Sequence, residues 1–190
     1  GSLILDAFGV VMAKGSFSLD LGTVTKNTTE YQSMVLTLTS AEVFVGVGGV
    51  LDDNETESVY DDDTLNLEEA IGFHATLSLS LVTLKDAGTL AATTDDKSYL
   101  GLNLSGFTAE LVGVDGLTLG VYAGGLQVNQ AKDTDANAAN DPAKLDWTTF
   151  FEGTDREDLD GTLEVAGTVD IRASGSLVLD AFEVGMAKGS

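Results

Sequence analysis

The chain has 190 residues, with 31 acidic and nine basic side chains, and a formal net charge of −22. That charge repels phosphate groups, so we expect no nucleic-acid partner and no attraction to anionic lipid. No apolar run is long enough for a transmembrane helix, which adds to the expectation that the chain does not insert into a membrane. The absence of Cys excludes disulfides and thiolate chemistry within the chain.

Apolar and polar residues alternate with a period of two through most of the chain, which predicts strands with one buried face. The alternating segments are residues 17–21, 36–38, 43–47, 77–81, 100–104, 126–128 and 163–179. Gly-rich or Asn-rich turn signals separate them, among them 14–16, 26–28, 48–49, 115–116, 124–125, 166–167 and 174–175. Changes of parity at 81–82 and 104–107 predict a bulge or a sheet corner. Only 67–71 could form a helical turn.

The spacing of these turns predicts an all-β fold of predominantly antiparallel strands. A sandwich and a barrel-like unit fit this pattern equally well. A β-solenoid is the alternative, because 163–179 keeps one parity throughout.

An internal repeat is the strongest signal in the chain. GSLILDAFGVVMAKGS at 1–16 returns as GSLVLDAFEVGMAKGS at 175–190, with thirteen of sixteen positions identical and an offset of 174 residues. We interpret 1–174 as one full repeat unit and 175–190 as the start of the next copy. Long periodic chains usually repeat a shape to add reach or valency. In such an array the two matching segments should occupy equivalent strands at opposite ends of the unit.

Acidic residues concentrate in loops, and Ca²⁺ prefers sets of carboxylate and carbonyl oxygens. Calcium is therefore the cofactor that this pattern favours, with solvated acidic loops as the alternative. The EF-hand-like opening at 133–137 lacks the Gly and the bidentate Glu of a complete EF-hand. The candidate ligands are Asp155, Glu157, Asp158, Asp160, Asp133, Asp135, Asn137, Asp52 and Asp53.

Nothing in the sequence indicates an enzyme. His74 is the only His, which argues against His-based triads, and its place in a strand pattern predicts a structural role. No pair of carboxylates stands out for polysaccharide hydrolysis. Trp147 is expected to anchor the core. An open cleft around Tyr60, Tyr122 or Trp147 would instead favour a carbohydrate-binding β-sandwich.

Several stretches resemble repeats of very large bacterial adhesin-like surface proteins of the haemagglutinin or calcium-binding type. They are YLGLNLSGFTAELVGVDGLTLGVYAGGLQVNQAKD, then LDWTT, VFVGVGG, and EDLDGTLEVAGTVDIRASGSLVLDAFEVGMAKGS running on into the start of the chain. The resemblance implies secretion or display on a bacterial cell surface, and a role in adhesion or spacing. The calcium-binding nonapeptide GGxGxDxUx is absent, and the resemblance transfers no catalytic residues.

We therefore expect a structural or adhesive repeat module of a giant secreted or cell-surface protein, stiffened by Ca²⁺. Its expected partners are neighbouring repeats of the same chain, together with surface glycans or another cell. A carbohydrate-binding β-sandwich module is the alternative.

Overall fold

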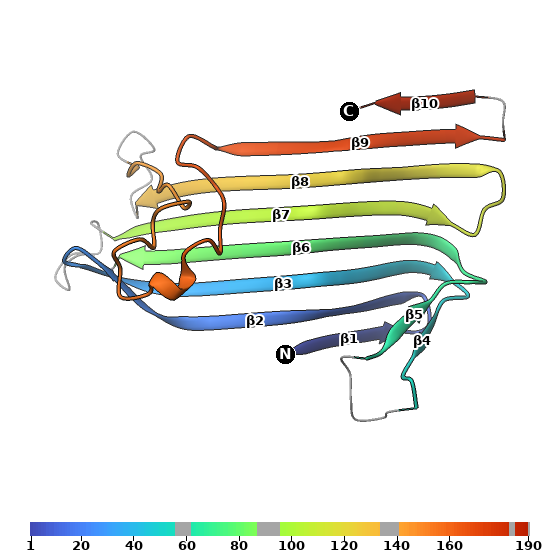
Figure 1. Cartoon of the computed structure of the whole chain (residues 1–190), viewed down its shortest axis with the longest axis horizontal. Helices are drawn as coiled ribbons and strands as arrows, with labels where there is room; N and C mark the ends of the chain where they lie inside the picture. The colour runs from blue at the N-terminus through green and yellow to red at the C-terminus, as the bar shows by residue number, and fades with distance from the viewer. Residues whose placement is uncertain (56–61, 87–95, 134–140, 183–184, 190) are drawn as a thin grey trace.

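The computed structural model describes residues 1–55, 62–86, 96–133, 141–182 and 185–189. Its main feature is an eight-stranded sheet in the order β1-β2-β3-β6-β7-β8-β9-β10, in which every neighbouring pair is antiparallel (Figure 1). The strands are β1 Ser2–Ala7, β2 Val11–Lys26, β3 Thr29–Val47, β6 Ile71–Asp86, β7 Lys97–Val112, β8 Leu117–Asp133, β9 Ile171–Ala181 and β10 Gly185–Gly189. The inserted pair β4 (Val50–Asp52) and β5 (Thr64–Asn66) forms a separate small sheet.

The prediction of an all-β, antiparallel fold is confirmed. The sheet is open, because β1 and β10 form opposite edges (Figure 1). Within the described residues the strands therefore form one meandering layer, rather than a two-sheet sandwich, a closed barrel or a solenoid. The only helical element described is one 3₁₀ turn, η1 (Glu157–Leu159), and the turn at 67–70 closes with a hydrogen bond from Ala70 N to Leu67 O (3.1 Å).

Strand alternation gives the sheet two faces of different character. We call the face that carries Leu19, Leu36, Leu81, Leu102, Val128 and Ile171 the open face; these residues are successive cross-strand partners. The opposite face is the covered face. Its equivalent polar row is Ser18, Thr37, Ser80, Asn103, Gln127 and Arg172.

A line of bulges crosses the middle of the sheet. The register shifts at 38–41 in β3, at 104–109 in β7 and at 122–125 in β8. Ser40, Gly106 and Ala123 lie at these points with positive φ of 50°, 62° and 50°. Each bulge adds one residue, which changes the parity of the positions that point to the open face. The apolar residues change parity at the same points, so the open face stays apolar on both sides of the line.

The bulge predicted from the parity change at 104–107 is thus confirmed, whereas the bulge or sheet corner predicted at 81–82 is wrong. Strand β6 runs through this point without a register shift. Leu81 lies on the open face, and Val82 lies on the covered face, where it is fully buried. The predicted turns at 14–16, 124–125 and 174–175 are also wrong, because β2, β8 and β9 continue through these positions.

The main core lies under a segment of irregular structure, residues 141–170, which packs on one end of the covered face (Figure 1). Trp147, Phe151, Leu163 and Val165 are fully buried there. They pack against strand residues of the covered face, chiefly Val24, Val35, Val82, Leu84 and Tyr99. Gly101 leaves the space that the Trp147 indole occupies, since a Cβ at Gly101 would lie 2.6 Å from Trp147 Nε1.

Asn129 provides the polar anchor of this core. Its side-chain amide donates to Leu145 O (2.8 Å) and Ala166 O (3.1 Å), and its Oδ1 accepts a bond from Trp147 Nε1 (3.1 Å). A buried side chain with all these bonds made fixes the covering segment in one position.

A smaller core closes the other end of the covered face. Met12, Phe44 and Ala70 are buried there, with Leu65 and Leu67 packed against them. Both ends of the covered face are therefore packed, and its middle carries mostly hydroxyl and amide side chains. No equivalent cover lies over the open face among the described residues.

Candidate functional site

The open face is the most unusual surface of the molecule. Exposed large hydrophobic side chains gather on it, including Leu21 (68% exposed), Ile171 (69%) and Leu19 (51%). The others on this face are Leu3, Leu5, Phe17, Val45, Val47, Ile71, Phe73, Leu177 and Leu179. Soluble monomers rarely expose an apolar patch larger than a few hundred Å², so a surface of this kind indicates an interaction site.

Charge is nearly absent from the open face. The charged residues of the eight-stranded sheet that it carries are Glu30, Lys85 and Lys132. The other charged strand residues, such as Asp6, Asp20, Glu42, Glu110 and Asp180, belong to the covered face. Among the described residues of the eight-stranded sheet, the acidic side chains other than Glu30 therefore lie on the covered face.

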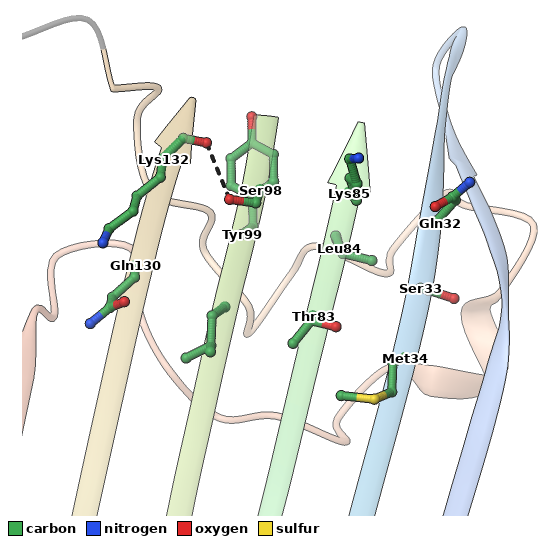
Figure 2. A pocket seen from close by; sticks show the side chains of 11 residues that line it. Gln32, Ser33, Met34, Thr83, Leu84, Lys85, Ser98, Tyr99, Gln130 and Lys132 are labelled. Carbon is green, nitrogen blue, oxygen red and sulfur yellow. Dashed lines mark hydrogen bonds between the residues drawn. The ribbon is translucent and has the colours of Figure 1, made fainter. Parts of the chain in front are cut away.

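A polar row ends the open face at one side. Thr23, Gln32, Lys85, Ser98 and Lys132 are successive cross-strand partners there. All of them except Thr23 line a shallow hollow of about 460 Å³, whose lining comes from β3, β6, β7 and β8 (Figure 2). Lys85 Nζ pairs with Asp96 at 3.4 Å. This row marks where the apolar surface stops.

The two edges of the sheet carry the repeated motif in the same geometry. In the first hairpin Leu3 pairs with Gly15, and Asp6 pairs with Met12. In the second, Leu177 pairs with Gly189, and Asp180 pairs with Met186, each at the offset of 174 residues. The two motifs therefore form hairpins of identical register at opposite edges, as the repeat predicts.

The aromatic residue at each hairpin tip shows the difference between the two environments. Phe8 and Phe182 are equivalent, and both have positive φ (59° and 52°). Phe182 N donates to Gly116 O in the turn between β7 and β8, and its ring lies near Gly116. Phe8 is fully exposed. Phe182 is 63% exposed, and its contact with Gly116 in this turn is one that Phe8 lacks.

The predicted ligands at 155–160 already have protein partners. Asp155 Oδ1 accepts from Thr25 N (2.7 Å), and Glu157 Oε1 accepts from Gly153 N (3.0 Å). Arg156 lies among them and donates to both oxygens of Asp158 and of Asp20 in β2, at 3.0–3.1 Å. This guanidinium places a positive charge beside these carboxylates, and Ca²⁺ binding at 155–160 stays a prediction.

The other predicted ligands are only partly described. Asp52 and Asp53 each accept a bond from the backbone N–H two residues on, at Asn54 (3.0 Å) and Glu55 (3.1 Å). Asp133 N donates to Asp141 Oδ1 (3.3 Å), while Asp135 and Asn137 lie outside the described residues. Asp160 follows η1, and its N–H donates to Glu157 O. Among the described residues, no group of three or more His, Asp or Glu side chains is arranged to hold a metal.

His74 lies in β6 on the covered face, between two carboxylates from the neighbouring strands. Its Nε2 is 3.9 Å from Glu42, and its Nδ1 is 4.0 Å from Glu110. Lys14 extends the group, with Nζ 3.6 Å from Glu42 and donating to Asp63 O at 3.0 Å. This cluster of polar side chains links β2, β3, β6 and β7 beside the small core.

The aromatic residues considered as candidates for binding a sugar make other contacts. Trp147 is fully buried, which confirms its predicted place in the core. Tyr122 donates to Glu110 Oε2 (3.3 Å) and lies over Gly120, where a Cβ would be 2.8 Å from its ring. Tyr60 lies outside the described residues.

Comparison with protein-family models, with curated proteins and with solved structures finds no match. Among the described residues, no helix is long and apolar enough to cross a membrane. The sequence pattern alone did not identify the open face as uncovered, because alternation is the same whether or not a second layer packs on it. The matching edges were found from the repeat.

Proposed function

We propose that this chain contains one period of a tandem array in which the sheet continues from each period to the next. Such an array would serve as the structural or adhesive shaft of a very large secreted or cell-surface bacterial protein. The observation that carries the proposal is the identical register of the two hairpins at opposite edges.

The pairing of β9 supports a specific junction between periods. Strand β9 pairs with β8 on one side and with β10 on the other. Its residues 176–181 are equivalent to β1, and five of these six residues are identical. The β1 edge therefore presents almost the same surface to which β8 binds, and β8 of a preceding period would pair with it.

The array also accounts for features that look unfavourable in one period. The unpaired N–H and C=O groups of β1 would be satisfied by β8 of the preceding copy, which removes an exposed edge. Phe8 would lie against the preceding turn, as Phe182 does against Gly116. Each period would add the strands β1, β2, β3, β6, β7 and β8, and extend the sheet by about 29 Å at a spacing of about 4.8 Å per strand.

A chain of two joined periods, residues 1–174 followed by 1–190, tests the junction against the 190-residue chain. We expect its thermal midpoint to rise and its unfolding to remain a single transition, because adjoining repeats stabilise each other. Small-angle scattering should show a growth of about 29 Å across the strands. An unchanged midpoint, with two bodies joined by a flexible connection, would contradict the array.

Cell-surface display has its own test in the organism that encodes the chain. An antibody against the 190-residue chain should label intact cells as strongly as permeabilised ones. A cytosolic protein that is labelled only after permeabilisation is the control. Labelling that also requires permeabilisation would exclude an extracellular shaft and leave the array itself untouched.

A further inference from the structure

We propose that the open face packs against the open face of a second copy of this sheet, so that the two copies form the layers of a sandwich. This inference concerns the face of the sheet, whereas the array concerns its edges. It holds for the 190-residue chain by itself, so either proposal can fail without the other.

The first argument is the continuity of the apolar surface. Next to the row through Leu81 lies a second apolar row, made of Phe17, Leu38, Leu79, Leu104, Leu126 and Ala173. Beyond the line of bulges, Val45, Phe73 and Leu111 continue it as successive cross-strand partners. A face that alternation keeps apolar over most of its length is typical of the inner face of a two-layer structure.

The second argument is size. Strands β2, β3, β6, β7 and β8 have 16–19 residues each. At about 4.8 Å between strands and about 3.4 Å per residue they present a face of roughly 1,300 Å². A stable protein–protein interface buries about 800 Å² on each partner. The open face exceeds this area even when its polar end is left out.

The third argument is charge, which decides whether two acidic copies can meet. The whole chain carries −22, so random contact between copies is repulsive. On the open face, however, the charged strand residues are two lysines and one glutamate, all at the polar end. The rest of the face can be desolvated without burying a charged strand residue, and the other acidic residues of the sheet's strands stay on the outer sides of the pair.

The fourth argument favours protein over lipid. Surfaces that lie in a membrane interface are rich in Trp, Tyr, Lys and Arg, which anchor them at the headgroups. Tyr31, Tyr99 and Tyr122 belong to the covered face, and Trp147 is buried beneath its cover. The described aromatic residues of the open face are Phe residues such as Phe17 and Phe73, with no Trp or Tyr among them.

The test compares two substitutions at adjacent positions of β6 in the 190-residue chain. Leu81→Asp places a charge on the open face, and Ser80→Asp places the same charge on the covered face. Light scattering coupled to size exclusion should find the unmodified chain and Ser80→Asp as dimers at tens of micromolar. Leu81→Asp should be monomeric, with circular dichroism and the emission of buried Trp147 reporting that it is folded.

A thiol probe covers the case in which Leu81→Asp does not fold. The chain has no Cys, so Leu81→Cys and Ser80→Cys each introduce a single thiol. By mass action, the thiol from Leu81→Cys should react about tenfold more slowly with a bulky maleimide at high than at low protein concentration. The thiol from Ser80→Cys should react at one rate throughout.

Three results would overturn the proposal. One is a monomeric unmodified chain at tens of micromolar. Another is a dimer that Leu81→Asp leaves intact while folded, which would place the contact at an edge. The third is a chain that floats with phosphatidylcholine vesicles and loses this binding in Leu81→Asp, which would make lipid the occupant.

Discussion

Gly101 decides whether the covering segment can pack. A Cβ at this position would lie 2.4 Å from Leu163 Cδ2 and 2.6 Å from two atoms of the Trp147 indole, and both side chains are fully buried. These neighbours cannot move aside without disturbing the core and the hydrogen bond between Trp147 and Asn129.

We predict that Gly101→Ala lowers the free energy of unfolding by about 1–3 kcal/mol through overpacking. Gly22→Ala, on the same face, is the matched control, since its nearest neighbour would be Arg156 Nη1 at 3.5 Å. This control should stay within about 0.5 kcal/mol of the unmodified chain. Urea unfolding followed by far-ultraviolet circular dichroism measures both, and equal effects would mean that the indole does not need the space.

Asp158 should make the thermal stability of the chain depend on pH. The Arg156 guanidinium, through its hydrogen bonds, holds the pKa of the Asp158 carboxyl below its ordinary value. A carboxyl whose pKa is lower in the folded state stabilises above its unfolded pKa, and this contribution is lost as the pH falls through the folded value.

Asp158→Asn should therefore lower the thermal midpoint at pH 6, and the difference from the unmodified chain should shrink below about pH 4. Asp115→Asn, in the turn between β7 and β8, controls for the removal of one negative charge. A difference that persists unchanged at pH 2 would show that the substitution acts through packing rather than through the ion pair.

At the scale of the strand, the two hairpins let one substitution be tested in two environments. Gly1 and Phe17 exchange backbone hydrogen bonds, with N to O distances of 2.8 and 2.7 Å. Because such pairs alternate along an antiparallel ladder, the N–H of Ile4 points away from β2, toward the free edge. Val178, its equivalent in β9, directs the same N–H toward Gly120 of β8.

We predict that Val178→Pro lowers the free energy of unfolding by about 1–3 kcal/mol, since it leaves a carbonyl of β8 without its donor. Ile4→Pro removes only a donor at an edge, where Pro is tolerated, and should have less than half that effect. Guanidinium unfolding of both variants provides the measurement. Equal losses would show that β1 and β9 are not equivalent strands in different surroundings.

The strands themselves were predictable because period-two alternation reports which residues share a face. The bulges at Ser40 and Ala123 could not be predicted, because neither residue is a Gly, which would have indicated a positive φ. The prediction of a bulge or corner at 81–82 was wrong because β6 is apolar on both faces where the covering segment packs, with Val82 and Leu84 on the covered face. Within 141–170, the alternation at 163–169 wrongly predicted a strand, because Leu163, Val165 and Val169 instead pack against the covered face as irregular chain and β9 begins only at Ile171. The place of Trp147 in the core was assigned correctly.

For the whole molecule, calcium binding stays a prediction that rests on the acidic loops around Asp52, Asp133 and Asp155. A ligand that binds only the folded state adds about 2.7 kcal/mol at a hundred times its dissociation constant. For a chain of this length the thermal midpoint should then rise by about 5–10 °C in calcium relative to EDTA. A rise that magnesium reproduces, or no rise, would indicate that these loops keep the chain soluble through their charge and do not bind calcium specifically.

The direction of the hydrogen bonds has a mechanical consequence for the proposed array. Its long axis runs across the strands, and the bonds between antiparallel strands lie along that same direction. A pull on the ends would load one strand's bonds at a time, as in opening a zipper, rather than shear a whole ladder at once. Such a shaft would lengthen stepwise under modest tension, releasing one strand of chain per step, and would behave as an extensible tether instead of a stiff rod.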